Sequence, residues 1–119
     1  MKRRAWLGWL LAASGPVAWA DPSAAERARI ERLLDALAGR KDIHFVRNGK
    51  EYTAAQAADF LRGKLHWQFE KVATVQDFIN QIGTRSTTSG DVYRVRLADG
   101  RTLPSAQFLA QELQRIEKR

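Results

Sequence analysis

The sequence predicts an α+β fold in one small domain, with elements in the order α-ββ-α-α-ββ-α. Two turn dipeptides, Asn48-Gly49 and Asp99-Gly100, each separate two short strand-like stretches, which is typical of antiparallel hairpins. Four further stretches carry apolar residues at helical spacing, and most begin at a residue type that caps helices. We therefore expect two antiparallel hairpins packed on helices.

The first 20 residues predict a cleaved signal peptide. Residues 2–4 are basic, residues 5–13 are apolar, and Ala18-Trp19-Ala20 fits the A-x-A rule, so cleavage is expected after Ala20. The apolar run is shorter than the roughly 20 residues that span a bilayer. An uncleaved membrane anchor is the alternative, and the basic start leaves both the general secretory and the twin-arginine routes open. We expect a periplasmic protein whose single domain covers residues 21–119.

Composition limits the chemistry of that domain. Without the signal peptide, 17 Lys and Arg stand against 13 Asp and Glu, a net charge of +4. This modest charge, without basic residues interleaved with aromatic ones, argues against nucleic-acid binding. The chain has no cysteine. Disulfides, thiol catalysis and thiolate metal sites are therefore excluded, and the fold must depend on core burial.

The first helix is predicted over residues 21–39. Ser23 and Glu26 have the spacing of a capping box, in which each side chain bonds the backbone N–H of the other residue. Apolar residues then recur at helical spacing, and Gly39 is expected to end the helix. The inward residues are Ile30, Leu33, Leu34 and Leu37.

The first hairpin is expected to lead directly into a second helix. Strands at residues 43–46 and 50–52 flank Asn48-Gly49, and Thr53 with Gln56 predicts a second capping box. The helix is predicted over residues 54–71. It has two apolar stripes, one of which holds Phe60 and Trp67, so we expect burial on more than one side of a central helix.

The second half of the chain repeats the pattern of helix and hairpin. Thr74 and Asp77 predict a short helix that ends at Gly83, followed by a hydroxyl-rich loop at residues 84–91. Strands are expected at residues 92–97 and 101–103. A last helix then starts at Pro104-Ser105. Its inward residues are predicted to be Ala106, Leu109, Leu113 and Ile116.

The sequence contains few groups that could carry catalysis. His44 and His66 are isolated from each other and lack metal-ligand spacing, and nucleotide-binding or nucleophile-elbow motifs are absent. Paired carboxylates for glycoside hydrolysis could come from Glu51, Asp59 and Glu70, although each is more simply a surface residue. We expect no cofactor and no metal, and we favour a protein that is not an enzyme.

The hydroxyl-rich loop is the better candidate for a site. Ser86, Ser89 and the Gly90 backbone, with Arg85 nearby, could present hydrogen-bond donors to an anionic or carbonyl-bearing ligand. Positive charge would be added by Arg47, Arg62 and Lys64 if the second helix passes near the hairpin turn. The alternative is that the hydroxyls only satisfy the turn and the charges only keep the surface soluble.

The chain resembles the YfeK-like family of small exported bacterial proteins. The resemblance lies in Arg47-Asn48-Gly49, in Leu61-Arg62-x-Lys64 and in Ser86-x-x-Ser89-Gly90-x-x-Tyr93, and it runs through nearly all of residues 21–119 in order. It implies bacterial export and one compact domain, and it implies no particular activity. Members often carry His where Phe60 stands here, which argues against a general base at that position.

These patterns predict a non-enzymatic periplasmic module that binds another envelope protein or an anionic small ligand or glycan. The alternative is a small cell-envelope hydrolase that uses Ser86 or Ser89 with a distant acid or His44. A structural envelope protein without a site is a third hypothesis. A hydrolase needs a serine within reach of a base in a concave pocket, whereas a binding module needs the cations and the loop on one surface. The candidate binding residues are Arg47, Asn48, Arg62, Lys64, Arg85, Ser86, Ser89, Gly90 and Tyr93.

Overall fold

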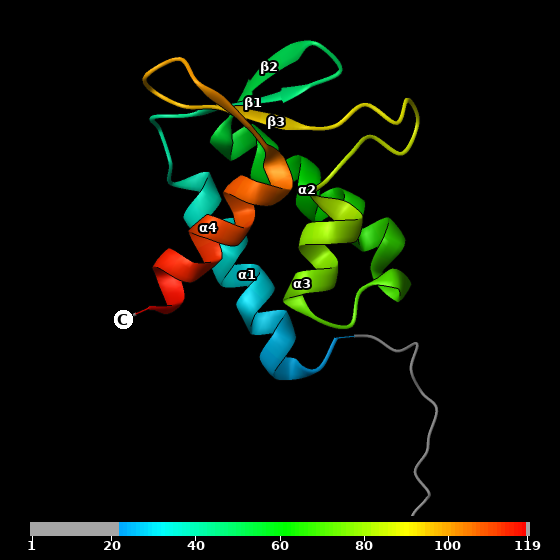
Figure 1. The fold of residues 1–119 in the computed structure, drawn as a ribbon. Helices are drawn as coiled ribbons and strands as arrows, with labels where there is room; N and C mark the ends of the chain where they lie inside the picture. The colour runs from blue at the N-terminus through cyan, green and yellow to red at the C-terminus, as the bar shows by residue number, and fades with distance from the viewer. Residues whose placement is uncertain (1–21, 119) are drawn as a thin grey trace, which may run out of the picture.

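The computed structural model describes residues 22–118, so the predicted signal peptide and its cleavage site lie outside the described residues. Within this range the chain forms helices and one antiparallel sheet of four strands, which confirms the predicted α+β class (Figure 1). The helices are α1 (Ala24–Ala38), α2 (Ala54–Gln68), η2 (Phe69–Lys71), α3 (Val75–Asp77), η3 (Phe78–Ile82) and α4 (Ser105–Glu117). The strands are β1 (His44–Arg47), β2 (Lys50–Thr53), β3 (Arg94–Arg96) and β4 (Thr102–Pro104).

The two predicted hairpins join into one sheet in the order β2-β1-β3-β4. The first strands of the two hairpins, β1 and β3, pair with each other, so that Phe45 lies beside Tyr52 on one side and Val95 on the other. The β1–β2 turn has the expected geometry, with positive φ at Asn48 (51°) and Gly49 (79°). The helices lie together on one side of the sheet (Figure 1).

The core lies between the sheet and the helices. Phe45, Tyr93 and Val95 face the helices from the sheet side and are buried. From the helical side, α1 contributes all four of its predicted inward residues, and it packs against both α2 and α4. No helix among residues 22–118 has the length and apolar composition needed to cross a membrane.

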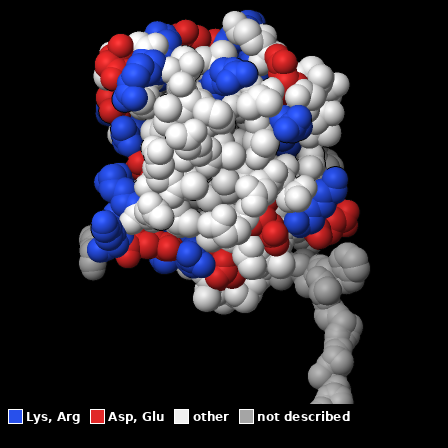
Figure 2. All heavy atoms as spheres, viewed as in Figure 1, with Lys and Arg blue, Asp and Glu red and all other residues white. Residues whose placement is uncertain are grey.

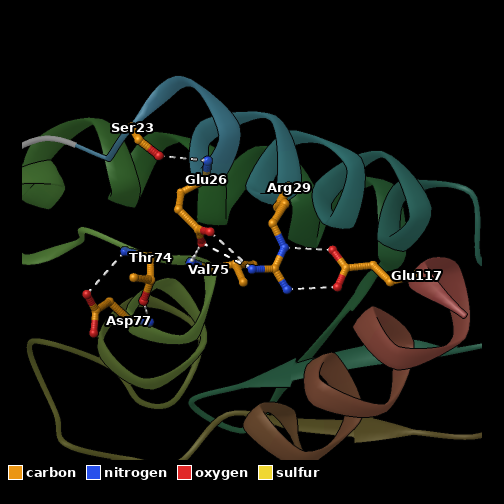
Figure 3. A network of polar contacts seen from close by, with 7 residues as sticks. All are labelled: Ser23, Glu26, Arg29, Thr74, Val75, Asp77 and Glu117. Atoms are coloured by element: carbon orange, nitrogen blue, oxygen red, sulfur yellow. Dashed lines mark hydrogen bonds and ion pairs between the residues drawn. The ribbon is translucent and has the colours of Figure 1, made fainter.

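The start of α1 differs from the predicted capping box. The Ser23 hydroxyl accepts a hydrogen bond from the Glu26 N–H at 3.2 Å, as expected. The reciprocal half of the box is wrong, because Glu26 instead accepts a hydrogen bond from the N–H of Val75 at 2.8 Å and pairs with Arg29 (Figure 3). Arg29 in turn donates two hydrogen bonds of 2.8 Å to Glu117. Glu26 and Arg29, on successive turns of α1, thus connect this helix to α3 and to α4.

The predicted two-sided burial of α2 holds for only part of its second stripe. The first stripe, Ala54, Ala57, Ala58 and Leu61, is buried, and Phe60 of the second is half-buried against the core, whereas Trp67 is 81% exposed. The capping box of Thr53 and Gln56 is confirmed, with bonds of 2.9 and 3.1 Å. The α-helix ends at Gln68 rather than at 71, and η2 continues it as a single 3₁₀ turn.

The short third helix is confirmed, with a change of helical type inside it. The capping box of Thr74 and Asp77 is present, but α3 passes after one turn into the π-helix η3. Gly83 follows η3, and a Cβ atom there would lie 2.6 Å from the side chain of Leu109. The glycine therefore permits close contact between the end of η3 and α4.

The buried face of α4 is rotated from the predicted one. Leu109 and Leu113 are buried as expected, but Ala106 and Ile116 are only partly buried. Phe108 and Glu112 are buried instead. Glu112 is 3% exposed and accepts a hydrogen bond of 2.6 Å from Arg40, and it also pairs with Arg115. Helical periodicity alone would predict that Glu112, as a charged residue, lies on the solvent-exposed face of α4.

Charge is spread over the surface seen in Figure 2. In this view, which is that of Figure 1, the side carrying α4 and α3 has a broad uncharged centre, and acidic and basic side chains alternate at its margin. This face thus has no continuous basic stripe of the kind that follows a nucleic-acid backbone.

Candidate binding groove

Side chains from β1, α2 and the loop before β3 line a groove with a volume of about 420 Å³. Volumes of this size fall in the range of small-ligand sites. The groove is lined by Arg47, Phe60, Lys64, Trp67, Ser86 and Tyr93, with Asp59, Gly63, Gln68, Thr87 and Thr88 completing it.

The rings of Phe60 and Tyr93 form the floor of the groove, and the buried Phe45 packs against Tyr93. Tyr93 is fully buried, and its ring centre lies 5.2 Å from that of Phe45 in a tilted arrangement. The ring of Phe60 meets Tyr93 edge to face at 5.9 Å. Both are favoured geometries for aromatic pairs. Since the rings come from β1, α2 and the end of the loop, the floor fixes these three segments relative to one another.

Two cations lie over this floor. The Arg47 guanidinium is 4.1 Å from the centre of the Phe60 ring, and the Lys64 ammonium is 4.9 Å from that of Tyr93. Each contact is a cation–π interaction. Neither cation forms an ion pair with any residue of 22–118, although Asp59 lies in the same groove. The Nε atom of Arg47 is buried without a hydrogen-bond partner.

Lys64 connects α2 to the end of η3 and to the loop. Its ammonium donates hydrogen bonds to the carbonyls of Ile82 at 3.0 Å and Arg85 at 2.7 Å, and to the hydroxyl of Tyr93 at 3.2 Å. All three acceptors are neutral. Burial, together with smaller effects of repulsion from Arg47 and Lys71, lowers the pKa of Lys64 to about 8. Lys64 remains mainly charged at neutral pH.

Burial also changes the titration of the groove floor. It raises the pKa of the Tyr93 hydroxyl, and the neighbouring Arg47 opposes part of this effect. Tyr93 is thus a neutral hydrogen-bonding group across the physiological range.

The hydroxyls of the loop hold its own turn together. The buried Ser86 side chain accepts a hydrogen bond from the Ser89 N–H at 3.2 Å and shares one of 3.0 Å with the Thr88 hydroxyl. Gly90 has a φ of 78°, a region that favours glycine. The Ser89 hydroxyl donates to the side-chain oxygen of Asn48 at 2.6 Å. The loop is therefore joined to the hairpin turn on one side and to Lys64 on the other.

Four of the nine predicted site residues line this groove, and three more lie in the hairpin turn and the loop that are bonded to them. Arg85 contributes only its carbonyl there, and its side chain is exposed. Arg62 lies elsewhere, because residues two positions apart on a helix do not face the same way. It pairs with Glu31 at 2.9 Å and Asp35 at 3.4 Å on α1, and lines a separate groove. The clustered residues are Arg47, Asn48, Lys64, Ser86, Ser89, Gly90 and Tyr93.

Sequence reasoning missed several residues that line the groove. Phe60 and Trp67 had been assigned to a buried stripe. The spacing of Phe60, Gly63, Lys64 and Trp67, at intervals of three and four, places them on one face of α2, and this pattern could have identified them. Gln68 and Thr87, joined by a hydrogen bond of 3.2 Å, had no such pattern.

The arrangement offers neither loop serine a catalytic base. The hydroxyls of Ser86 and Ser89 contact only other hydroxyls, backbone N–H groups and the Asn48 amide. His44 is exposed on β1, where alternation points it away from the buried Phe45 and the helices. Nor do residues 22–118 contain a cluster of acidic or histidine side chains suited to a metal ion.

Comparison with known sequences places the chain among proteins of unknown function. Residues 24–117 match the family described as "Family of unknown function (DUF5329)". The chain is also similar to the "Uncharacterized protein YfeK" of Salmonella typhimurium, with 40% identity over 76 residues, which is 64% of this chain and 63% of that protein. The match thus spans less than two thirds of the relative's length, and it confirms the predicted YfeK-like resemblance. No solved structure shows significant similarity.

Proposed function

Since this chain belongs to the DUF5329 family of unknown function, we propose a role from its own groove: a periplasmic, non-catalytic module that binds an anionic partner. The partner is either an acidic region of an envelope protein or an anionic small ligand or glycan. The observation that carries the proposal is the pair of cations, Arg47 and Lys64, which line one groove and form no ion pair with the part of the chain that the structure describes.

The two cations have different parts in this proposal. Lys64 donates to three acceptors of the protein, so it supplies charge and holds the loop. Arg47 lies over the ring of Phe60 and keeps donors for a ligand. A planar guanidinium binds carboxylate or phosphate through two parallel hydrogen bonds, which are stronger than bonds between neutral groups.

Rigidity of the groove supports a binding role as well. The loop is joined to the hairpin turn through Ser89 and to α2 through Lys64, and its buried Ser86 closes the turn. A groove that is ordered before the ligand arrives loses less conformational entropy on binding.

The anion-binding proposal is tested by an NMR titration of the chain that begins at Asp21, which contains every described element. Acetate, inorganic phosphate and tetraglutamate serve as probes. We expect amide shifts to change around Lys64 and Thr88, and these changes to disappear in Arg47→Met. The matched control is Arg101→Met, since Arg101 pairs only with Asp99 in the β3–β4 turn. If no probe affects the groove, or if both variants respond alike, the proposal is wrong.

Periplasmic location is the second part of the proposal, and it is supported by the signal-peptide pattern of residues 1–20. Expression of the full chain, osmotic-shock fractionation and amino-terminal sequencing provide the test. We expect a periplasmic product that begins at Asp21, and accumulation of the precursor in Ala18→Lys. A chain that keeps residues 1–20 and stays in the cytoplasm would contradict the location but not the binding role.

A further inference from the structure

Trp67 presents an indole ring to solvent at the groove. It is 81% exposed, the most exposed large apolar side chain of residues 22–118. The His66 ring meets it edge to face, with 5.6 Å between ring centres. A single exposed apolar residue is ordinary. Trp67 differs because it lines the same groove as the two unpaired cations.

Gly63 also lines this groove, four residues before Trp67 on α2. A glycine inside a helix costs about 1 kcal/mol relative to alanine. Close packing often explains such a glycine, but a Cβ atom built at Gly63 meets no atom within 4 Å. The domain itself therefore has no packing need for it. The space above Gly63 lets a ligand approach the helix backbone beside the indole ring.

The groove thus combines three kinds of ligand contact. Its floor carries cations, one wall is a flat aromatic face, and the rim carries the Gln68 amide and the hydroxyls of Thr87 and Thr88. An aromatic face is electron-rich, and it attracts the weakly positive C–H groups on the face of a sugar ring. The amide and hydroxyls suit the sugar's hydroxyl groups, and Arg47 suits a carboxylate.

Resting on the proposed anion-binding function, we propose that the ligand is an acidic glycan whose sugar ring stacks on Trp67 over Gly63 while a carboxylate pairs with Arg47. An acidic peptide fits less well. One cation lies over each of the rings of Phe60 and Tyr93, so Trp67 is the aromatic face of the groove that stays open to a flat ring, which an aspartate or glutamate side chain does not have.

Trp67 makes the proposal directly measurable. The other tryptophans, Trp6, Trp9 and Trp19, precede residue 21, so Trp67 is the single tryptophan of a chain that begins at Asp21. Its fluorescence is followed while tetrasaccharides of galacturonate, mannuronate and hyaluronan are added, with neutral maltotetraose and tetraglutamate as comparisons. We expect at least one acidic tetrasaccharide to change the emission, and both comparison ligands to leave it unchanged.

Calorimetry on variants then locates the contacts. Trp67→Ala, Arg47→Met and Gly63→Leu should each weaken binding of the acidic tetrasaccharide at least tenfold. Phe69→Ala is the matched control, because Phe69 is the other exposed large aromatic residue and lines the separate groove near Arg62. It should bind as the parent chain does. Gly63→Leu should also melt no lower than the parent, which separates its effect from misfolding.

The outcomes distinguish the ligand class from the binding function. If tetraglutamate binds equally well and depends on Arg47 but not on Trp67, the glycan proposal is wrong and anion binding stands. If maltotetraose binds equally well, charge has no role and both fail. If none of the three acidic tetrasaccharides binds, or if Gly63→Leu binds normally, the glycan proposal is also wrong.

Discussion

At the scale of single residues, Lys64 is the group whose surroundings are most unusual. Its ammonium is partly buried, has three neutral acceptors and has no carboxylate partner, and Arg47 lies in the same groove. Arrangements of this kind favour the uncharged amine and recur where a protein binds anions or carries out proton chemistry. The proposed anion-binding role uses this charge directly, because an anion in the groove would stabilise the protonated form of Lys64.

Because Lys64 is partly buried, the stability of the protein should depend on pH. The pKa of Lys64 is about 8 in the folded chain and lies near its ordinary value of 10.5 in the unfolded chain. Between these values the unfolded state binds more protons, so stability should rise as pH increases from 8. Urea denaturation from pH 7 to 9.5 tests this. The rise should be absent in Lys64→Met.

The denaturation series should stop at pH 9.5, because Tyr93 changes stability in the opposite direction at higher pH. The raised pKa of Tyr93 means that the folded chain keeps a proton which the unfolded chain loses near pH 10, so stability falls there. If the parent chain and Lys64→Met show the same slope below pH 9.5, the assignment to Lys64 is contradicted.

At the scale of elements, Gly63 and Gly83 differ in the space that surrounds them. Gly83 follows η3 where it contacts α4, and a Cβ atom there would come within 2.6 Å of Leu109. Gly63 lies in α2 with open space around it. The first glycine is required by packing inside the domain, and the second is not.

The same substitution should therefore have opposite effects at the two positions. Gly83→Ala should lower the free energy of unfolding by about 1–3 kcal/mol, because Leu109 must move in a packed core. Gly63→Ala should raise it by about 1 kcal/mol, because alanine is the better helix former. Thermal and urea denaturation measure both. Stabilisation by Gly83→Ala would show that the core between η3 and α4 has room to adjust.

Elements defined by local rules could be predicted from the sequence, and those defined by distant contacts could not. The Asn48-Gly49 turn and the Thr53 cap depend on neighbouring residues, so both were predictable. The pairing of β1 with β3 and the bond from Val75 to Glu26 join distant parts of the chain, and no local pattern specifies them. For the groove, residue type suggested Arg47 and Lys64, and helical spacing could have separated Lys64 from Arg62, but only the fold brings Arg47 of β1 beside Lys64 of α2.

At the scale of the whole molecule, ion pairs attach the last helix to the first part of the chain. Arg29 joins α1 to Glu117, and Arg40, in the link between α1 and β1, joins Glu112. The second pair differs from the first in burial, since Glu112 is 3% exposed. Removing one partner of a buried pair leaves a charge without full compensation.

Arg40→Met should therefore destabilise the protein by about 3 kcal/mol, near the lower end for a broken buried pair because Arg115 still contacts Glu112. Denaturation in urea at pH 7 gives the value. Arg101→Met removes a pair exposed on both sides and should change stability by less than about 1 kcal/mol. Combining Arg40→Met with Glu112→Leu should restore much of the loss. Equal effects of the two single substitutions would refute a special role for the buried carboxylate.

Acid should weaken the connection between α1 and α4. The pKa of Glu26 is lowered, mainly by the hydrogen bond from Val75, and that of Glu117 is lowered by its bonds from Arg29. Stability from depressed carboxyl groups is complete above their unfolded pKa of about 4.5 and is lost as pH falls through the folded values. Chemical denaturation between pH 6 and 3 should therefore show a steeper loss for the parent chain than for Glu117→Gln. Parallel curves would exclude Glu117 from the linkage.

The pairing of β1 with β3 has a consequence for how the chain acquires its structure. Phe45 and Val95 come together only after the intervening residues have closed a long loop, and contacts so far apart in sequence slow folding. A nascent chain that ends before β3 contains the first hairpin and every helix except α4, yet it lacks the strand that pairs with β1 and places Tyr93. The groove is thus completed late in folding, and an amino-terminal fragment that ends before β3 lacks the strand pairing that holds one side of it.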